Sequence, residues 1–74
     1  MKFPTKEMLE HYRAMYPAGT RVELVSMNDT QSPPVGTRGT VLYVDDAADL
    51  VMRWDNGSSL NVVLGEDSVR IVNE

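Results

Sequence analysis

One short stretch of the chain combines the residue types of a small binding site. Residues 53–59, RWDNGSS, place the single Trp between an Arg and an Asp and add an amide, a Gly and two hydroxyls. Trp54 and Asp55 would form an aromatic-and-carboxylate pocket if both faced solvent. The stretch also fits a core Trp followed by a turn, because Asn56-Gly57 strongly favours a two-residue type I′ hairpin. We favour the turn, and the direction of the Trp54 ring decides between the two interpretations.

The remaining sequence contains no pattern that predicts catalysis or metal binding. There is no Cys and only one His, His11, which excludes zinc sites built on thiolates or several imidazoles. Asp45, Asp46 and Asp49 lack the alternating oxygen ligands and mid-loop Gly of a calcium loop. Nucleophile elbows and phosphate-binding Gly loops are also missing. We therefore expect no enzyme, no cofactor and no metal.

The charge balance argues against nucleic acid as the main partner. Eleven acidic and seven basic residues give a formal charge of −4, which opposes a phosphate backbone. Four arginines nevertheless fall on separate predicted strands and form the alternative nucleic-acid site: Arg21, Arg38, Arg53 and Arg70. Strand alternation points Arg21, Arg53 and Arg70 outward. Pairing of these arginines with Glu23 and Asp55 on the same face is the favoured interpretation.

The N-terminal sequence and the lengths of the apolar runs bear on location. Residues 1–10, MKFPTKEMLE, lack the continuous apolar region of a signal peptide. No apolar run approaches the roughly 20 residues that a membrane-spanning helix needs. We expect a cytoplasmic protein without membrane contact.

An amphipathic helix is predicted over residues 5–16. Thr5 is a suitable N-cap, and Pro17 and Gly19 end the helix. Its apolar residues recur at helical spacing and form the helix stripe: Met8, Leu9, Tyr12, Met15 and Tyr16. This stripe must be buried on the protein's own sheet or on a partner, so it is a candidate interface.

After Gly19 the apolar period changes to two, which indicates strands. Five are predicted, at residues 20–27, 37–44, 50–55, 58–64 and 68–72. Gly39 suggests a bulge or sharp bend, and the two prolines in residues 28–36 mark the longest loop. The predicted fold is mainly β: a small five-stranded SH3-like barrel (19–74) with one N-terminal amphipathic α-helix (1–18), together a single folding unit.

Three pieces of the sequence resemble a bacterial and phage family known as domain of unknown function 4314. They are GTRVEL (19–24), PPVGTRGTV (33–41) and WDNGSSL (54–60), followed by GED (65–67). The resemblance covers about fifty of the 74 residues and leaves the helix outside. It implies a small β-barrel that is frequent in phages and mobile elements, with no established activity and no catalytic residues to transfer.

We expect a non-enzymatic interaction module that binds a protein partner, or a second copy of itself, through the helix stripe or a loop groove. By analogy with SH3-like barrels, the long first loop and the hairpin tips would flank that groove. The residues expected near it are Asn28, Asp29, Tyr43, Trp54 and Asp55. The alternatives are a nucleic-acid module that uses the four arginines, and a phage or mobile-element antagonist of a host protein.

Overall fold

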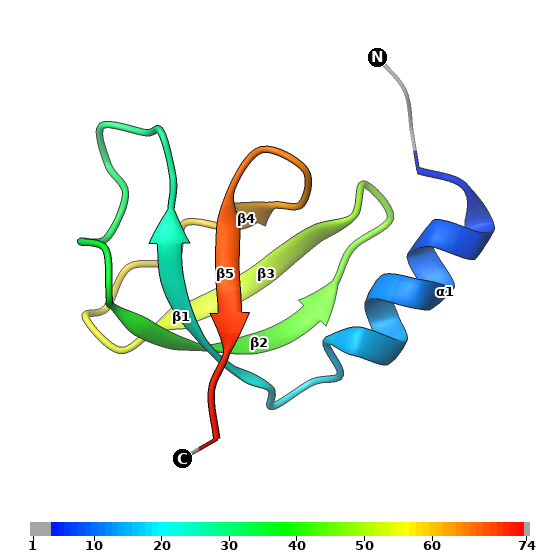
Figure 1. Cartoon of the computed structure of the whole chain (residues 1–74), viewed down its shortest axis with the longest axis horizontal. Coiled ribbons are helices and arrows are strands. Elements are labelled where there is room, and N and C mark those ends of the chain that lie inside the picture. Colours follow the sequence, from blue (N-terminus) through cyan, green and yellow to red (C-terminus); the bar gives the residue numbers. More distant parts are fainter. Residues whose placement is uncertain (1–3, 74) are drawn as a thin grey trace.

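The computed structural model describes residues 4–73 as one helix followed by five strands (Figure 1). The elements are α1 (Lys6–Met15), β1 (Arg21–Ser26), β2 (Arg38–Val44), β3 (Asp49–Trp54), β4 (Val62–Val63) and β5 (Ser68–Ile71). The prediction of a mainly β chain with one N-terminal helix is therefore confirmed.

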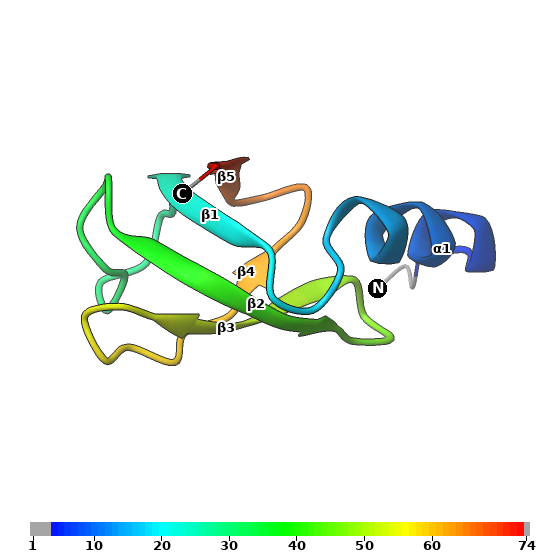
Figure 2. The same cartoon turned by 90° about the horizontal axis from the view of Figure 1, so that it is seen from below.

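The five strands form a single antiparallel sheet in the order β4-β3-β2-β1-β5. The register shifts between Val41 and Tyr43 and between Leu24 and Ser26, and such irregularities increase the local bend of a sheet. The sheet curls so that β1 and β5 lie over β3 (Figure 2). Within residues 4–73, however, the end strands β4 and β5 do not pair, so the predicted closed barrel is not observed.

The strand predicted at residues 58–64 is the least accurate, since only Val62–Val63 is regular. Before β4, the chain accepts hydrogen bonds from β3 without forming a regular strand pair. The Asn61 Oδ1 atom accepts a hydrogen bond from the Met52 N–H at 3.3 Å, and the Leu60 carbonyl accepts one from the Trp54 indole. Side-chain bonds of this kind replace the ladder that alternation predicts.

The predicted type I′ turn at Asn56-Gly57 is also wrong. Such a turn needs positive φ at both residues, but only Gly57 has it, at 91°. The Gly57 N–H donates to the Trp54 carbonyl and the Trp54 N–H donates to the Ser58 carbonyl, each at 3.0 Å. The hairpin therefore has a three-residue loop that ends in a left-handed Gly, the other common solution for this connection.

Alternate residues of the strands fill one core inside the curled sheet. Its members are Val22, Leu24, Val41, Val44, Leu50, Met52, Trp54 and Val62. Gly39 pairs directly with Trp54 in regular register, and the nearby bulge lies instead between Val41 and Tyr43. Gly39 is therefore needed for close approach to the Trp54 ring and not for the predicted bulge.

The helix α1 begins as the sequence predicts, with the Thr5 Oγ1 atom accepting a hydrogen bond from the Met8 N–H at 3.1 Å. None of its residues is fully buried, but Tyr12 and the following Tyr16 pack against the core. The helix stripe is thus partly covered by the protein's own sheet, while Met8 and Met15 remain 45% and 40% exposed. The helix of the described chain is neither long nor apolar enough to cross a membrane.

Arg13, in the last turn of α1, fixes the helix to the sheet. Its Nε and Nη2 atoms donate to the Val44 carbonyl at 3.2 and 3.1 Å. Its Nη2 atom also donates to the Asp46 carboxylate at 2.9 Å. One side chain therefore ties the helix to the end of β2 and to the β2–β3 turn.

Candidate functional site

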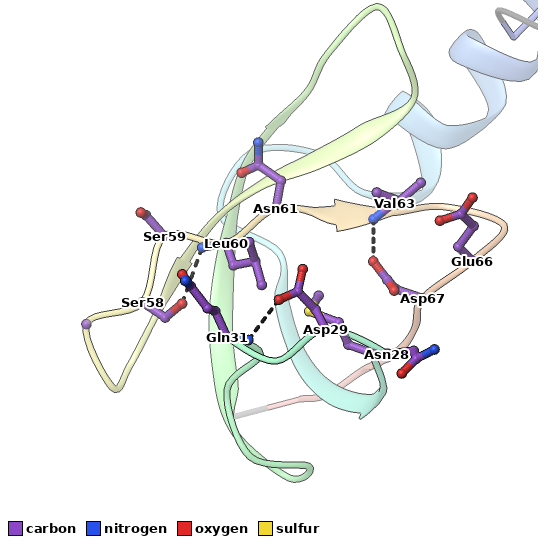
Figure 3. A pocket seen from close by; sticks show the side chains of 12 residues that line it. Asn28, Asp29, Gln31, Ser58, Ser59, Leu60, Asn61, Val63, Glu66 and Asp67 are labelled. Carbon is purple, nitrogen blue, oxygen red and sulfur yellow. Dashed lines mark hydrogen bonds between the residues drawn. The ribbon is translucent and has the colours of Figure 1, made fainter. Parts of the chain in front are cut away.

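One hollow of the described surface is a groove formed by three loop segments (Figure 3). Residues 27–31 follow β1, residues 57–61 follow the β3 hairpin turn, and residues 63–67 lead into β5. This loop groove is open to solvent and has a volume of about 650 Å³. Small-molecule and peptide side-chain sites typically measure about 300–1,000 Å³, so the groove has a useful size for binding.

The loop groove is polar and carries negative charge. Asn28, Ser59 and Asn61 contribute amide and hydroxyl groups, and the carboxylates of Asp29, Glu66 and Asp67 also line the groove. Among its described lining residues there is no Lys, Arg or His. A surface with charges of one sign attracts ligands of the opposite sign, so this groove favours cations and hydrogen-bond donors.

The loops around the groove are held by bonds from side chains to the backbone (Figure 3). The Asp29 Oδ1 atom accepts a hydrogen bond from the Gln31 N–H at 2.8 Å. The Asp67 Oδ2 atom accepts one from the Val63 N–H at 2.8 Å. Asp and Asn stabilise turns in this way because their short side chains reach the nearby backbone. The groove is therefore largely formed before any ligand arrives.

The acidic character extends from the groove to the start of β3. Burial raises the pKa of Asp49 above its ordinary value, and the charges of Asp45, Asp67 and Glu66 raise it further. Even so, residues 4–73 contain no group of three or more His, Cys, Asp or Glu side chains placed to hold a metal ion. The amides, hydroxyls and carboxylates that line the groove can form hydrogen bonds and attract positive charge.

The structure brings together only two of the five predicted binding residues. Asn28 and Asp29 line the loop groove, whereas Tyr43, Trp54 and Asp55 do not. Trp54 is only 1% exposed, and its indole N–H donates to the Leu60 carbonyl at 2.7 Å. Strand alternation places Trp54 with Leu50 and Met52 in the core, so its ring is not available as a ligand-binding surface.

Asp55 and Tyr43 lie outside the groove for different reasons. The Asp55 carboxylate accepts two hydrogen bonds from Arg21, at 2.8 and 2.5 Å. The hydrogen bond from Arg21 lowers the pKa of Asp55 below its ordinary value. Tyr43 is exposed beside the register shift of β2.

The four arginines occupy the outer face of the sheet, as strand alternation predicts for Arg21, Arg53 and Arg70. Cross-strand register places Arg21 and Arg53 on either side of Thr40, and Arg38 and Arg70 on either side of Glu23. We call this surface the arginine face. The Glu23 carboxylate accepts hydrogen bonds from Arg70 at 2.9 Å and from Arg38 at 3.3 Å. The bond from Arg70 lowers the pKa of Glu23 most strongly, and that from Arg38 adds to it.

Sequence reasoning missed most of the residues that form the groove. Gln31, Ser59, Asn61, Glu66 and Asp67 were not predicted as site residues, although all lie in segments rich in turn-forming types. The available signal was the presence of three polar loops on one sheet. The three loops come together only because the sheet curls, and the residue pattern within each loop does not predict that curl.

The fold is therefore a small mainly β domain with an appended helix and a polar groove between its loops. A family model described as domain of unknown function (DUF4314) matches residues 5–72, and the chain belongs to this family. The match begins before α1, so the helix is part of the family pattern, contrary to the expectation that this pattern starts at Gly19. Searches of curated proteins and of solved structures gave no match.

Proposed function

We propose that the protein is a non-enzymatic interaction module, of SH3-like type, that binds an extended segment of a protein partner in the loop groove. The observation that carries the proposal is the preformed polar groove with three carboxylates and no basic residue among its described lining. The antiparallel order of five short strands and the curled sheet support the SH3-like assignment.

The lining chemistry suggests the kind of segment that would bind. Asp29 and Glu66 would attract a Lys or Arg side chain, and Asn28 and Asn61 would bond to the peptide groups of an extended backbone. Met27 and Leu60 supply a limited apolar surface at the same site. A short basic segment satisfies these groups better than an apolar helix does.

The competing surfaces of the molecule are less suited to be the main site. Tyr12 and Tyr16 of the helix stripe already pack on the core, which leaves Met8 and Met15 as separate exposed positions. On the arginine face, Glu23 and Asp55 accept bonds from three of the four arginines. A phosphate backbone would compete with these carboxylates and would be repelled by the groove. These points favour a protein partner over nucleic acid.

The proposal can be tested by selecting ligands from a library of random peptides displayed on an inert carrier. The variant Glu66→Arg reverses one groove charge, and the Glu66 side chain makes none of the hydrogen bonds found in residues 4–73. Glu10→Arg makes the same change on the exposed side of α1 and serves as the matched control.

We expect the wild-type protein and Glu10→Arg to enrich the same Lys- or Arg-containing peptides, and Glu66→Arg to bind them at least about tenfold more weakly. Equal binding by all three proteins would place the peptide site elsewhere. Enrichment of acidic peptides, or of none, would remove the groove as a binding site for basic segments.

A further inference from the structure

The strand β5 has an open hydrogen-bonding edge. Among residues 4–73 it pairs with β1 alone, and the Val72 N–H donates to the Arg21 carbonyl at 3.0 Å. In an antiparallel pair, residues alternately point their N–H and C=O groups toward and away from the partner strand. This bond and the register Val22–Ile71 place the N–H and C=O groups of Val69 and Ile71 on the side away from β1.

The opposite edge of the sheet is closed by its own turn. Val63 on β4 also points its backbone groups away from its neighbour β3, but both are occupied. The Val63 N–H donates to the Asp67 carboxylate at 2.8 Å, and the Val63 carbonyl accepts from the Glu66 and Asp67 N–H groups at 3.0 and 2.9 Å. An unpaired edge is a template for another strand, and natural proteins usually protect it. Here one edge is protected in this way and the other is not.

The side chains along β5 define what an added strand would meet. Ile71 lies on the core face, opposite the buried Val22, yet it is 48% exposed. Val69 on the same face packs against the core. An added strand would place one of its side chains beside Ile71, where an apolar group would cover this exposed surface.

On the other face of β5 the added strand would meet Arg70. On the arginine face the described carboxylates Glu23 and Asp55 pair with Arg38, Arg70 and Arg21, and the Arg70 side chain remains 57% exposed. Arg70 would sit in a non-hydrogen-bonded pair with the new strand, the position in which opposing side chains approach most closely. A carboxylate opposite Arg70 therefore complements the charge of this exposed guanidinium.

We propose that β5 accepts an extended peptide of a protein partner as an additional strand, with an apolar residue beside Ile71 and an acidic residue opposite Arg70. This site is separate from the loop groove, and its ligand has the opposite charge. Strand addition supplies affinity through backbone bonds at Val69 and Ile71, and specificity through the alternating side chains.

A second copy of the chain fits this edge less well than such a peptide. Antiparallel pairing of two β5 strands that aligns Val69 with Ile71 of the other copy would place Arg70 opposite Arg70. Like charges directly opposite one another destabilise a strand pair. The charge pattern thus favours a partner with a carboxylate at that position.

The experiment uses the full chain and two short blocked peptides, one of alternating valine and glutamate and one of alternating valine and lysine. Binding is followed by backbone amide chemical shifts and hydrogen exchange. Chemical synthesis supplies a chain N-methylated at Ile71, which deletes the outward N–H without touching the bonds to β1. Ile71→Val keeps that N–H and is the control.

We expect the glutamate peptide to bind more tightly than the lysine peptide, with slowed exchange of the Val69 and Ile71 amides. N-methylation should weaken binding about tenfold, the loss expected for one hydrogen bond and a blocked edge, while Ile71→Val binds normally. Preference for the lysine peptide, shifts confined to the loop groove, or no effect of N-methylation would each overturn the proposal. Protection of Ile71 that grows with protein concentration alone would assign the edge to a second copy instead.

Discussion

Replacement of Gly39 by Ala tests the packing that places Trp54 in the core. A Cβ atom at Gly39 would lie 2.8 Å from the Trp54 Cε3 atom, 3.0 Å from the Arg53 carbonyl oxygen and 3.1 Å from the Met52 Cε atom. The Met52 methyl group can shift, but the Arg53 carbonyl belongs to the paired strand and the Trp54 ring is enclosed by the core. The strand or the ring must therefore move.

The expected change in the free energy of unfolding for Gly39→Ala is the difference between two effects. Overpacking of a filled core costs about 1–3 kcal/mol. Removal of a Gly from the unfolded chain returns about 0.4–1 kcal/mol, because Ala has fewer unfolded conformations. Gly39→Ala should therefore lower the free energy of unfolding by about 1–2 kcal/mol. For a domain of this size, that corresponds to a Tm lower by about 5–15 °C.

Urea unfolding followed by far-UV circular dichroism, a signal that does not depend on the single Trp, measures this loss, and a double-mutant cycle identifies its cause. In a Trp54→Phe background the smaller ring should reduce the cost of Gly39→Ala by about 1 kcal/mol. Gly57→Ala is the contrasting control: its Cβ would meet no atom within 4 Å, and its cost comes from the φ of +91°. That cost should be the same in both backgrounds. A Gly39→Ala protein as stable as the wild type would refute the close contact. So would a cycle in which Gly39→Ala costs the same with Trp or Phe at residue 54.

Three further predictions concern the anchoring of the helix and the dependence of stability on pH. Arg13→Ala should lower the free energy of unfolding by about 1 kcal/mol and speed amide exchange throughout α1. Asp46→Asn should lower it by less than about 0.5 kcal/mol, because the Asp46 carboxylate is 96% exposed. Equal losses for the two variants would contradict the role of the Val44 carbonyl as the main partner of Arg13. The lowered pKa of Glu23 means that its contribution to stability is present above the ordinary Glu value of 4.5 and is lost as the pH falls, so Glu23→Gln should flatten the acid limb of a plot of Tm against pH. The pKa of Asp49 is raised, so its contribution is present at acid pH and lost as the pH rises above the ordinary Asp value of 3.8. Asp49→Asn should therefore raise the Tm at neutral pH and leave it unchanged below pH 3.8, and a loss of stability at neutral pH would contradict this sign.

The local features of the fold follow closely from residue types. Thr5 predicts the helix start because its hydroxyl caps the first turn, and period-two alternation predicts β1, β2 and β3 because one face of each is buried. The same alternation predicts the core position of Trp54. These predictions succeed because each depends on interactions within a few residues or on the burial of a single face.

The errors concern features that depend on distant parts of the chain. Residues 58–61 have a strand-like pattern, but they bond to β3 through Asn61 and the Leu60 carbonyl, which removes the regular ladder. Arg13 lies on the polar side of α1, and only the path of β2 brings the Val44 carbonyl within its reach. The loop groove likewise requires three loops to meet after the sheet has curled.

The central claim is that the loop groove binds a basic peptide segment, and amide chemical-shift mapping tests it most directly. The measurement titrates isotope-labelled protein with a Lys- or Arg-containing peptide selected by the wild-type chain. The largest shifts should fall in residues 27–31, 57–61 and 63–67, and they should be lost in Glu66→Arg but retained in Glu10→Arg. Shifts centred on the helix stripe or the arginine face, or unchanged binding by Glu66→Arg, would contradict the proposed function.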